Sequence, residues 1–352
     1  MQEFVDAKEI AGSVTLVADE GKVLHLAATG LADLATAAPM KADAIFWIAS
    51  MTKPVTATAV MMMQEEGKLS VDDPIAKYLP EFADLKDPEG KPVSVTIKQC
   101  LTHTSGLQDL PAGMGKGLLT LEDFTKAVAP LPLKALPGAK WEYCQTGINA
   151  VGRIVEVVSG ESYPDFLAKH LFVPLGMSST GFYLNEEQAA RLATSYKRTP
   201  EGVLEKVELP FFEGQPATSR NRYPRANGGL FSDAEDYAKF ARMILNGGEL
   251  DGRRYLKEGS VKQMTTVQTG SLATGFTPGN GWGLGWCVVR QPQAVSATLS
   301  AGSFGHGGAY GTQVWIDPVK KRVHLLLIQR SDLPNSDGSE IRRGFQEADS
   351  GL

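Results

Sequence analysis

The 352-residue sequence lacks several features that would assign a protein to a particular class. No apolar run approaches the ~18 residues that a membrane-spanning helix needs, so we expect no membrane span. The first twelve residues also lack the basic end and the apolar stretch of a signal peptide. This start favours a cytoplasmic protein, or an exported one whose signal peptide is absent from this chain.

Cysteine is scarce and histidine is scattered. The three cysteines, Cys100, Cys144 and Cys287, are an odd set without close spacing, which argues against a disulfide framework and a zinc site. The five histidines form no HExxH pattern. We therefore predict that the chain uses no catalytic metal and no cofactor.

An excess of positive charge is also missing. Lys and Arg number 35 against 40 Asp and Glu, and the net charge of -5 offers no electrostatic reason to expect nucleic-acid binding. The densest basic stretch contains Arg220, Arg222 and Arg225 around Pro224 and is typical of a loop. We expect a solvated loop there; the alternative is a site for an anionic substrate group.

Strand patterns are present at both ends of the chain. Residues 13–18 and 22–30 are rich in Val, Leu and Thr and flank a turn, which predicts a hairpin. Residues 313–316 and 322–328 predict a second hairpin, and a final helix is expected near residues 339–348. Strands at both termini with helices beside them indicate one α/β lobe built from both chain ends.

Between these ends the composition is mainly helical. Few strand signals interrupt it, so residues 69–210 are predicted to form a mostly helical lobe inserted into an α/β lobe of residues 1–68 and 211–352. We expect the active site in the cleft between the two lobes. Helices are predicted at residues 55–66, 121–128, 147–159, 163–171 and 237–245.

A candidate nucleophile precedes the first of these helices. The GxSxG string of many hydrolases is absent, but Ser50-Met51-Thr52-Lys53 forms an SxxK string. If Ser50 opens the helix, Lys53 lies one turn further on the same face, and free N–H groups at the helix start suit an oxyanion. A buried lysine can lose its proton and act as a base. Taken alone, however, this string more often marks a helix cap followed by a surface lysine.

Further strings occur in a characteristic order along residues 12–330. Jointly they resemble the serine β-lactamase and penicillin-binding-protein superfamily, with the closest likeness to class C β-lactamases and family VIII carboxylesterases. The resemblance implies an α+β fold of the β-lactamase-like type, an antiparallel sheet flanked by helices with an inserted mostly helical lobe. The strings are Phe46 to Lys53, Leu101 to Leu107, Pro137 to Tyr143, Pro174 to Met177, Asn227 to Ser232, Gly281 to Trp286 and Gly305 to Gly308.

The second motif of this family is Tyr-x-Asn, and here it is Tyr143-Cys144-Gln145. The resemblance implies that Tyr143 shares protons with Lys53 and Ser50. Which of the first two takes the serine proton stays open, because coupled groups titrate together. Gln145 can still donate and accept through its amide, so it is a candidate for contact with the substrate. We expect the Cys144 side chain to point away from that of Tyr143 and not to act as a nucleophile.

The third motif is Lys-Thr-Gly in the family and His306-Gly307-Gly308 here. By position, the N–H of Ala309 would join the N–H of Ser50 as an oxyanion hole, and Gly308 would permit the close backbone approach. His306 is mostly neutral near pH 7, so it offers a weaker handle for a substrate carboxylate than lysine does. This replacement favours a neutral ester. His103, in the second string, is expected to be structural.

These residues predict a serine carboxylesterase that cleaves small or short-chain acyl esters through an acyl-enzyme on Ser50, with weak β-lactam hydrolysis as a side activity. The alternatives are a true β-lactamase, a D-aminopeptidase-like hydrolase, an acyltransferase, or a non-catalytic penicillin-recognising binding protein. The expected partner is a small-molecule ester or amide. The sequence leaves the natural substrate and the oligomeric state open.

Overall fold

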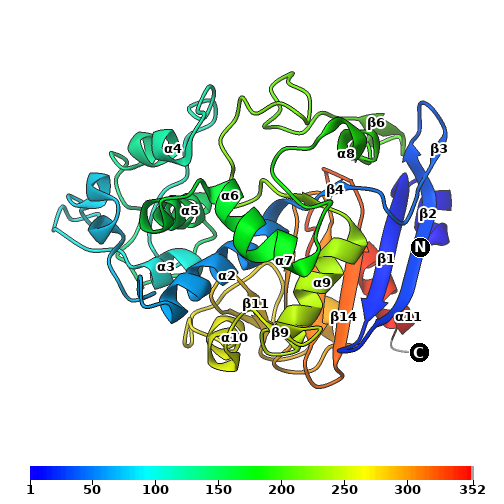
Figure 1. The fold of residues 1–352 in the computed structure, drawn as a ribbon. Coiled ribbons are helices and arrows are strands. Elements are labelled where there is room, and N and C mark those ends of the chain that lie inside the picture. Colours follow the sequence, from blue (N-terminus) through cyan, green and yellow to red (C-terminus); the bar gives the residue numbers. More distant parts are fainter. Residues whose placement is uncertain (350–352) are drawn as a thin grey trace.

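An antiparallel sheet of eight strands forms the centre of the computed structural model, which describes residues 1–349. The strand order is β10-β11-β12-β13-β14-β1-β2-β3, so the two ends of the chain meet inside the sheet (Figure 1). β1 pairs with β2, and β13 pairs with β14, which confirms both predicted hairpins. The strands are β1 (Gly12–Ala18), β2 (Val23–Asp33), β3 (Ala38–Pro39), β10 (Asn280–Trp282), β11 (Cys287–Val289), β12 (Phe304–Gly307), β13 (Gln313–Asp317) and β14 (Arg322–Leu327).

Helices cover both faces of this sheet, and the period-two alternation of the strands decides which residues meet them. Leu325 and Leu327 of β14 belong to the main core, where α9 (Ala234–Leu245) packs on β1 and β14. Leu326, between them, points to the other face and packs with α11 (Glu340–Asp349) and α1 (Gln2–Asp6). The final helix that the sequence predicts is thereby confirmed, as is the α+β class.

A second group of helices lies on the far side of α2 (Thr52–Glu65) from the sheet (Figure 1). Most of the predicted helices are confirmed within three residues, while the one predicted over residues 163–171 divides into α6 (Tyr163–Leu167) and η4 (Ala168–Phe172). The lobe boundaries at residues 68 and 210 stay a prediction. The group consists of α3 (Ile97–Leu101), α4 (Leu121–Val128), α5 (Gln145–Ser159) and α6. From α6 the chain continues through η4 and α7 (Val173–Leu175) toward α9, and α8 (Glu186–Ala190) lies on the β2–β3 side of the molecule (Figure 1).

Short elements complete the fold. Three two-stranded ladders stand apart from the main sheet: β4 (Phe46–Trp47) with β7 (Phe231–Ser232), β5 (Tyr196–Arg198) with β6 (Leu204–Lys206), and β8 (Glu249–Leu250) with β9 (Arg253–Arg254). The remaining helical pieces are η1 (Ala49–Met51), η2 (Ile75–Lys77), η3 (Pro80–Phe82), α10 (Glu258–Thr265) and η5 (Ala294–Ser296). Within residues 1–349, the helices are too short or too polar for any of them to cross a membrane.

Helix α2 is buried on almost every side, and α5 and α10 pack against it. Met61 and Met63 are fully buried in the core, as expected for residues that fill irregular space. The threonines of α2 tolerate burial because their hydroxyls donate to carbonyls of the preceding turn, as Thr58 does to Pro54 O at 3.0 Å. The start of α2, which carries the SxxK string, is therefore held deep in the molecule.

Candidate active site

Ser50 lies in the short helical turn η1, which runs directly into α2. The preceding residue, Ala49, has a φ of 45°, a left-handed conformation that is uncommon for a residue with a side chain. Thr52 holds this sharp turn, since its hydroxyl donates to Ala49 O at 2.7 Å and accepts from Leu230 N at 3.2 Å. Ser50 is thus presented at the head of α2, partly exposed.

The Lys53 side chain reaches back to Ser50 over one helical turn. Its Nζ donates to Ser50 Oγ at 3.0 Å and to Asn227 O at 2.7 Å. Lys53 is fully buried, and this burial lowers its pKa to about 7, although the charges of Asp109, Cys144 and Asp337 act in the opposite direction. A large share of the Lys53 side chains is therefore neutral near pH 7, and a neutral amine can accept a proton.

Tyr143 lies against the same lysine. The Lys53 Nζ is 4.6 Å from the centroid of the Tyr143 ring. Burial raises the pKa of the Tyr143 phenol above its ordinary value of 10, and a hydrogen bond with Ser50 opposes this shift. The structure thus brings Ser50, Lys53 and Tyr143 together, as the resemblance implies, and it favours a neutral phenol beside a lysine of lowered pKa.

Two buried histidines border Tyr143. The His103 ring centroid lies 4.3 Å from that of Tyr143, and its Nδ1 accepts the Cys144 N–H at 3.1 Å. Burial lowers the pKa of His103 well below its usual range, which agrees with the structural role expected for it. Burial, together with the charge of Lys53, also lowers the pKa of His306 to about 3, so His306 is neutral at pH 7.

The Cys144 side chain points toward Leu107 and Asp109. Its Sγ lies 3.3 Å from Leu107 O and 3.3 Å from Asp109 Oδ1, so its single S–H can donate to either oxygen. Burial raises the pKa of the Cys144 thiol to about 12, so the nucleophilic thiolate is scarce. These contacts agree with the expectation that Cys144 is not a nucleophile.

Gln145 begins helix α5 and faces Asn227. Asn227 Nδ2 donates to Gln145 Oε1 at 2.8 Å, and the Asn227 N–H donates to Asn149 Oδ1 at 3.1 Å. The start of α5 is held by Asp109, whose Oδ1 accepts the N–H groups of Gln145 at 2.6 Å and Thr146 at 2.9 Å. Gln145 is therefore anchored by side chains from two distant loops.

The end of β12 packs tightly against the turn that carries Ser50. A Cβ added at Gly308 would lie 2.1 Å from Thr312 Oγ1 and 2.7 Å from Ile48 O, so a side chain there would force the two segments apart. Thr312 Oγ1 also donates to Ile48 O at 3.3 Å. This packing explains the glycine and places exposed Ala309 next to the Ser50 turn. The oxyanion hole formed by the N–H groups of Ser50 and Ala309 stays a prediction.

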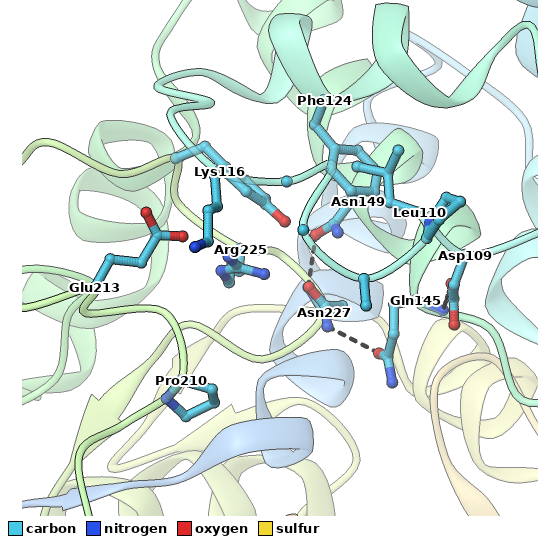
Figure 2. A pocket seen from close by; sticks show the side chains of 15 residues that line it. Asp109, Leu110, Lys116, Phe124, Gln145, Asn149, Pro210, Glu213, Arg225 and Asn227 are labelled. Carbon is cyan, nitrogen blue, oxygen red and sulfur yellow. Dashed lines mark hydrogen bonds between the residues drawn. The ribbon is translucent and has the colours of Figure 1, made fainter.

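A cavity of about 310 Å³ opens beside these residues (Figure 2). Its lining includes Gln145 and Asn227, together with residues from the loops 111–119 and 213–223. Ser50 is not part of this lining. Asn227 connects the cavity to the catalytic residues, because its carbonyl accepts a hydrogen bond from Lys53 Nζ and the residue also lines the cavity.

The basic loop does not match its expected solvated character. Arg222 is buried, and its Nη2 donates to Phe182 O at 2.9 Å and Ala217 O at 3.0 Å. Arg225 is half-buried and lines the cavity, whereas Arg220 is exposed as expected. The expectation is wrong for two of the three arginines, because a cluster of charges in the sequence does not reveal which carbonyls and rings will surround them.

Some residues at this site carry no strong sequence signal. Asp109 lies 36 residues before the helix it caps, and Asp337 reaches the site from the loop before α11. A Cβ added at Gly307 would overlap Asp337 Oδ1, so the carboxylate lies directly over this glycine. Gln313 Nε2 donates to the same oxygen at 3.2 Å. Neither aspartate is recognisable without the tertiary fold.

Comparison with known proteins gives matches over almost the whole chain. A family model described as beta-lactamase matches residues 1–349. Esterase EstB of Burkholderia gladioli is 31% identical, covering 91% of this chain and 86% of EstB. Penicillin-binding protein 4 of Amycolatopsis lactamdurans is 33% identical, covering 89% of this chain and 79% of that protein. The solved structure of EstCE1, described as a hydrolase with promiscuous acyltransferase activity, has a TM-score of 0.86 and 28% identity, covering 99% of this chain and 95% of EstCE1.

Proposed function

The chain is a serine hydrolase of the beta-lactamase family, and on that premise we propose that it cleaves carboxylic esters of small or short-chain acyl groups through an acyl-enzyme on Ser50. The observation that carries this proposal is the 3.0 Å hydrogen bond between Lys53 Nζ and Ser50 Oγ. With the proton on the serine, the same contact allows the neutral amine to accept that proton as the oxygen attacks.

The proposed reaction has two stages. In the first, Ser50 Oγ adds to the ester carbonyl carbon while its proton passes to Lys53, and the N–H groups of Ser50 and Ala309 stabilise the resulting oxyanion. The C–O bond to the alcohol then breaks, and the Lys53–Tyr143 pair returns the proton to the departing oxygen. In the second stage, water attacks the acyl-enzyme by the same route and releases the carboxylic acid. These steps need only proton transfers within the site.

Lys53 fits the role of initial base better than Tyr143. Burial lowers the pKa of Lys53 to about 7, which is near the pH at which a general base is most effective. Burial shifts the pKa of Tyr143 in the other direction, so its phenolate is scarce at the same pH. We assign proton relay to the Tyr143 hydroxyl, since it forms a hydrogen bond with Ser50 and its ring centroid lies 4.6 Å from Lys53 Nζ.

A preference for esters over penicillins follows from the charges near β12. His306 is buried and neutral, and the Asp337 carboxylate lies over Gly307. His306 thus offers no positive charge to the carboxylate of a β-lactam, where the family motif has a lysine. The esterase name of the Burkholderia relative supports the same preference.

We predict that kcat/KM for 4-nitrophenyl butyrate exceeds that for nitrocefin by about 10-fold or more, because one missing charge-assisted hydrogen bond typically costs a factor of this size. Steady-state assays of both substrates on one enzyme preparation measure the ratio. A higher value for nitrocefin than for every short ester tested would identify a true β-lactamase instead. Activity on D-amino acid amides alone would favour a D-aminopeptidase-like hydrolase.

Acyl transfer to an alcohol is a second candidate, supported by the description of EstCE1 as a hydrolase with promiscuous acyltransferase activity. An added alcohol would then compete with water for the acyl-enzyme, and the product mixture would contain the new ester. A non-catalytic penicillin-recognising protein is the alternative from another class. Failure of the wild type to react with a fluorophosphonate probe would favour it.

The pH dependence of ester hydrolysis tests the role of Lys53. We predict that kcat/KM rises with pH and levels off above an apparent pKa of about 7, because only the deprotonated amine accepts the Ser50 proton. Below this pKa, activity should fall about tenfold per pH unit. A flat profile between about pH 5 and pH 9 would contradict the assignment.

A matched pair of variants sharpens this test. The negative charge of Asp337 raises the pKa of Lys53, so Asp337→Asn should move the acid limb of the profile to lower pH. Asp84→Asn is the control, because Asp84 is exposed and does not contribute to the Lys53 shift. Its profile should overlay that of the wild type.

A further inference from the structure

An arginine without an anionic partner lines the cavity beside the catalytic residues. Within residues 1–349, the buried Nε of Arg225 has no hydrogen-bond partner, and its guanidinium forms no ion pair. Its contacts are with two aromatic rings, since the guanidinium carbon lies 4.5 Å from the centroid of Tyr223 and 5.6 Å from that of Phe211. A half-buried cation that rests on rings, with its donors unpaired, is arranged to bind an acceptor.

The neighbouring arginine shows how a purely structural arginine looks in this loop. Three backbone carbonyls, those of Ser219, Phe182 and Ala217, accept hydrogen bonds from Arg222. These bonds tie the loop to its surroundings and leave little donor capacity. Arg225 has no such carbonyls, so holding the loop in place does not account for it.

The position of Arg225 connects it to the reaction centre. It precedes Asn227 by two residues. The Asn227 carbonyl accepts a hydrogen bond from Lys53 Nζ at 2.7 Å, and Asn227 Nδ2 donates one to Gln145 Oε1 at 2.8 Å. In Figure 2, Arg225 and Lys116 lie on the side of the cavity opposite Asp109 and Gln145. A substrate whose carbonyl is at Ser50 can therefore extend past Asn227 toward Arg225.

The acidic residues of the cavity leave this cation available. Asp109 Oδ1 is engaged by the first N–H groups of α5, at 2.6 Å from Gln145 N and 2.9 Å from Thr146 N. Glu213 lies at the exposed rim near Lys116 and forms no ion pair within residues 1–349. It partly offsets the positive potential without occupying the Arg225 donors.

The β12 side of the site does not offer a second position for a substrate anion. Neutral His306 supplies no positive charge near β12, and the Asp337 carboxyl group over Gly307, whose pKa is raised by burial, supplies none either. Arg225 therefore supplies a cation on the side of the cavity across from Gln145, whereas the family motif carries its cation on the strand.

We propose that Arg225, assisted by Lys116, binds a carboxylate at the far end of the substrate arm that occupies this cavity. The inference rests on the proposed ester hydrolysis and names its substrate class as esters that carry a remote anionic group, such as half-esters of dicarboxylic acids. A planar guanidinium can bind a carboxylate through two parallel hydrogen bonds. A site built for this contact discriminates against analogues without the charge.

Matched substrates test the proposal. The acyl-arm pair is 4-nitrophenyl hydrogen glutarate and its methyl ester, and the alcohol-arm pair is 4-acetoxybenzoate and its methyl ester. We expect the wild type to prefer the charged member of one pair by about 10- to 100-fold in kcat/KM, the usual effect of a charge-assisted hydrogen bond. The pair that shows the preference identifies the arm that enters the cavity.

Three variants locate this preference. Arg225→Met should reduce the ratio of charged to neutral kcat/KM to about 1, while Arg220→Met, which removes an exposed arginine of the same loop, should leave it unchanged. Glu213→Gln should raise the ratio of charged to neutral kcat/KM, because it removes a negative charge near the proposed carboxylate site. The increase should be only a few-fold, because the Glu213 charge is exposed and screened by salt. This opposite sign keeps the test decisive even if Arg225→Met folds poorly.

The outcomes separate the two proposals. Hydrolysis of the neutral esters that depends on Ser50, without preference for either charged member, would overturn the carboxylate site alone. Equal losses on charged and neutral substrates in Arg225→Met, with no effect of Glu213→Gln, would also overturn it. A wild type that is inert toward all four esters would overturn the proposed function as well.

Discussion

Ser50→Ala is expected to lower kcat for 4-nitrophenyl butyrate by a factor of about 10⁴ to 10⁶. The hydroxyl is the proposed nucleophile, so its loss removes the covalent route and leaves substrate binding and oxyanion stabilisation. The side chain is partly exposed, and it accepts a hydrogen bond from Lys53. The fold should therefore survive the substitution, and thermal unfolding of both proteins checks this.

The control for this substitution is Ser178→Ala. Ser178 is exposed, and its backbone carbonyl, which accepts Gln188 Nε2 at 2.9 Å, is retained in alanine. This variant should keep wild-type activity and react with a fluorophosphonate probe, whereas Ser50→Ala should not react. Ester hydrolysis that persists in a folded Ser50→Ala protein would mean that another group is the nucleophile.

Lys53→Met is expected to reduce kcat/KM for the same ester by about 10² to 10⁴, the usual contribution of a general base. Methionine fills a similar volume but cannot accept the Ser50 proton. Because Lys53 is fully buried and burial lowers its pKa to about 7, the amine is held in an unfavourable environment. The free energy of unfolding should therefore stay unchanged or increase while activity falls.

Urea denaturation measures the free energy of unfolding, and steady-state kinetics on the same preparation measure the loss of activity. Lys239→Met is the control, since Lys239 also donates to a backbone carbonyl, that of Gly176, and forms an ion pair with Asp236. Its removal should affect stability without loss of activity. If kcat/KM of Lys53→Met still rose with pH around an apparent pKa of about 7, another group would be the base, and Tyr143 would be the first to examine.

Much of the fold could be predicted because its signals are local. The hairpins around residues 19–21 and 318–321 follow from alternating apolar residues on either side of turn residues. Helix α4 matches its predicted range, and its start is marked by a capping box between Thr120 and Asp123. The predicted helix over residues 163–171 is interrupted, because α6 gives way at Leu167 to the wider turn of η4.

The candidate site also combines features that local sequence predicts with features that depend on the whole fold. The sequence by itself determined the spacing of Ser50 and Lys53, which corresponds to one helical turn. The character of that lysine was decided only by the tertiary structure, because its burial and its bond to Asn227, 174 residues away, require the packed molecule. The contrast between Arg222 and Arg225 was decided in the same way, since both belong to one basic string in the sequence. Local spacing depends on backbone geometry alone, whereas pKa and available donors depend on desolvation and on partners that long-range folding brings together.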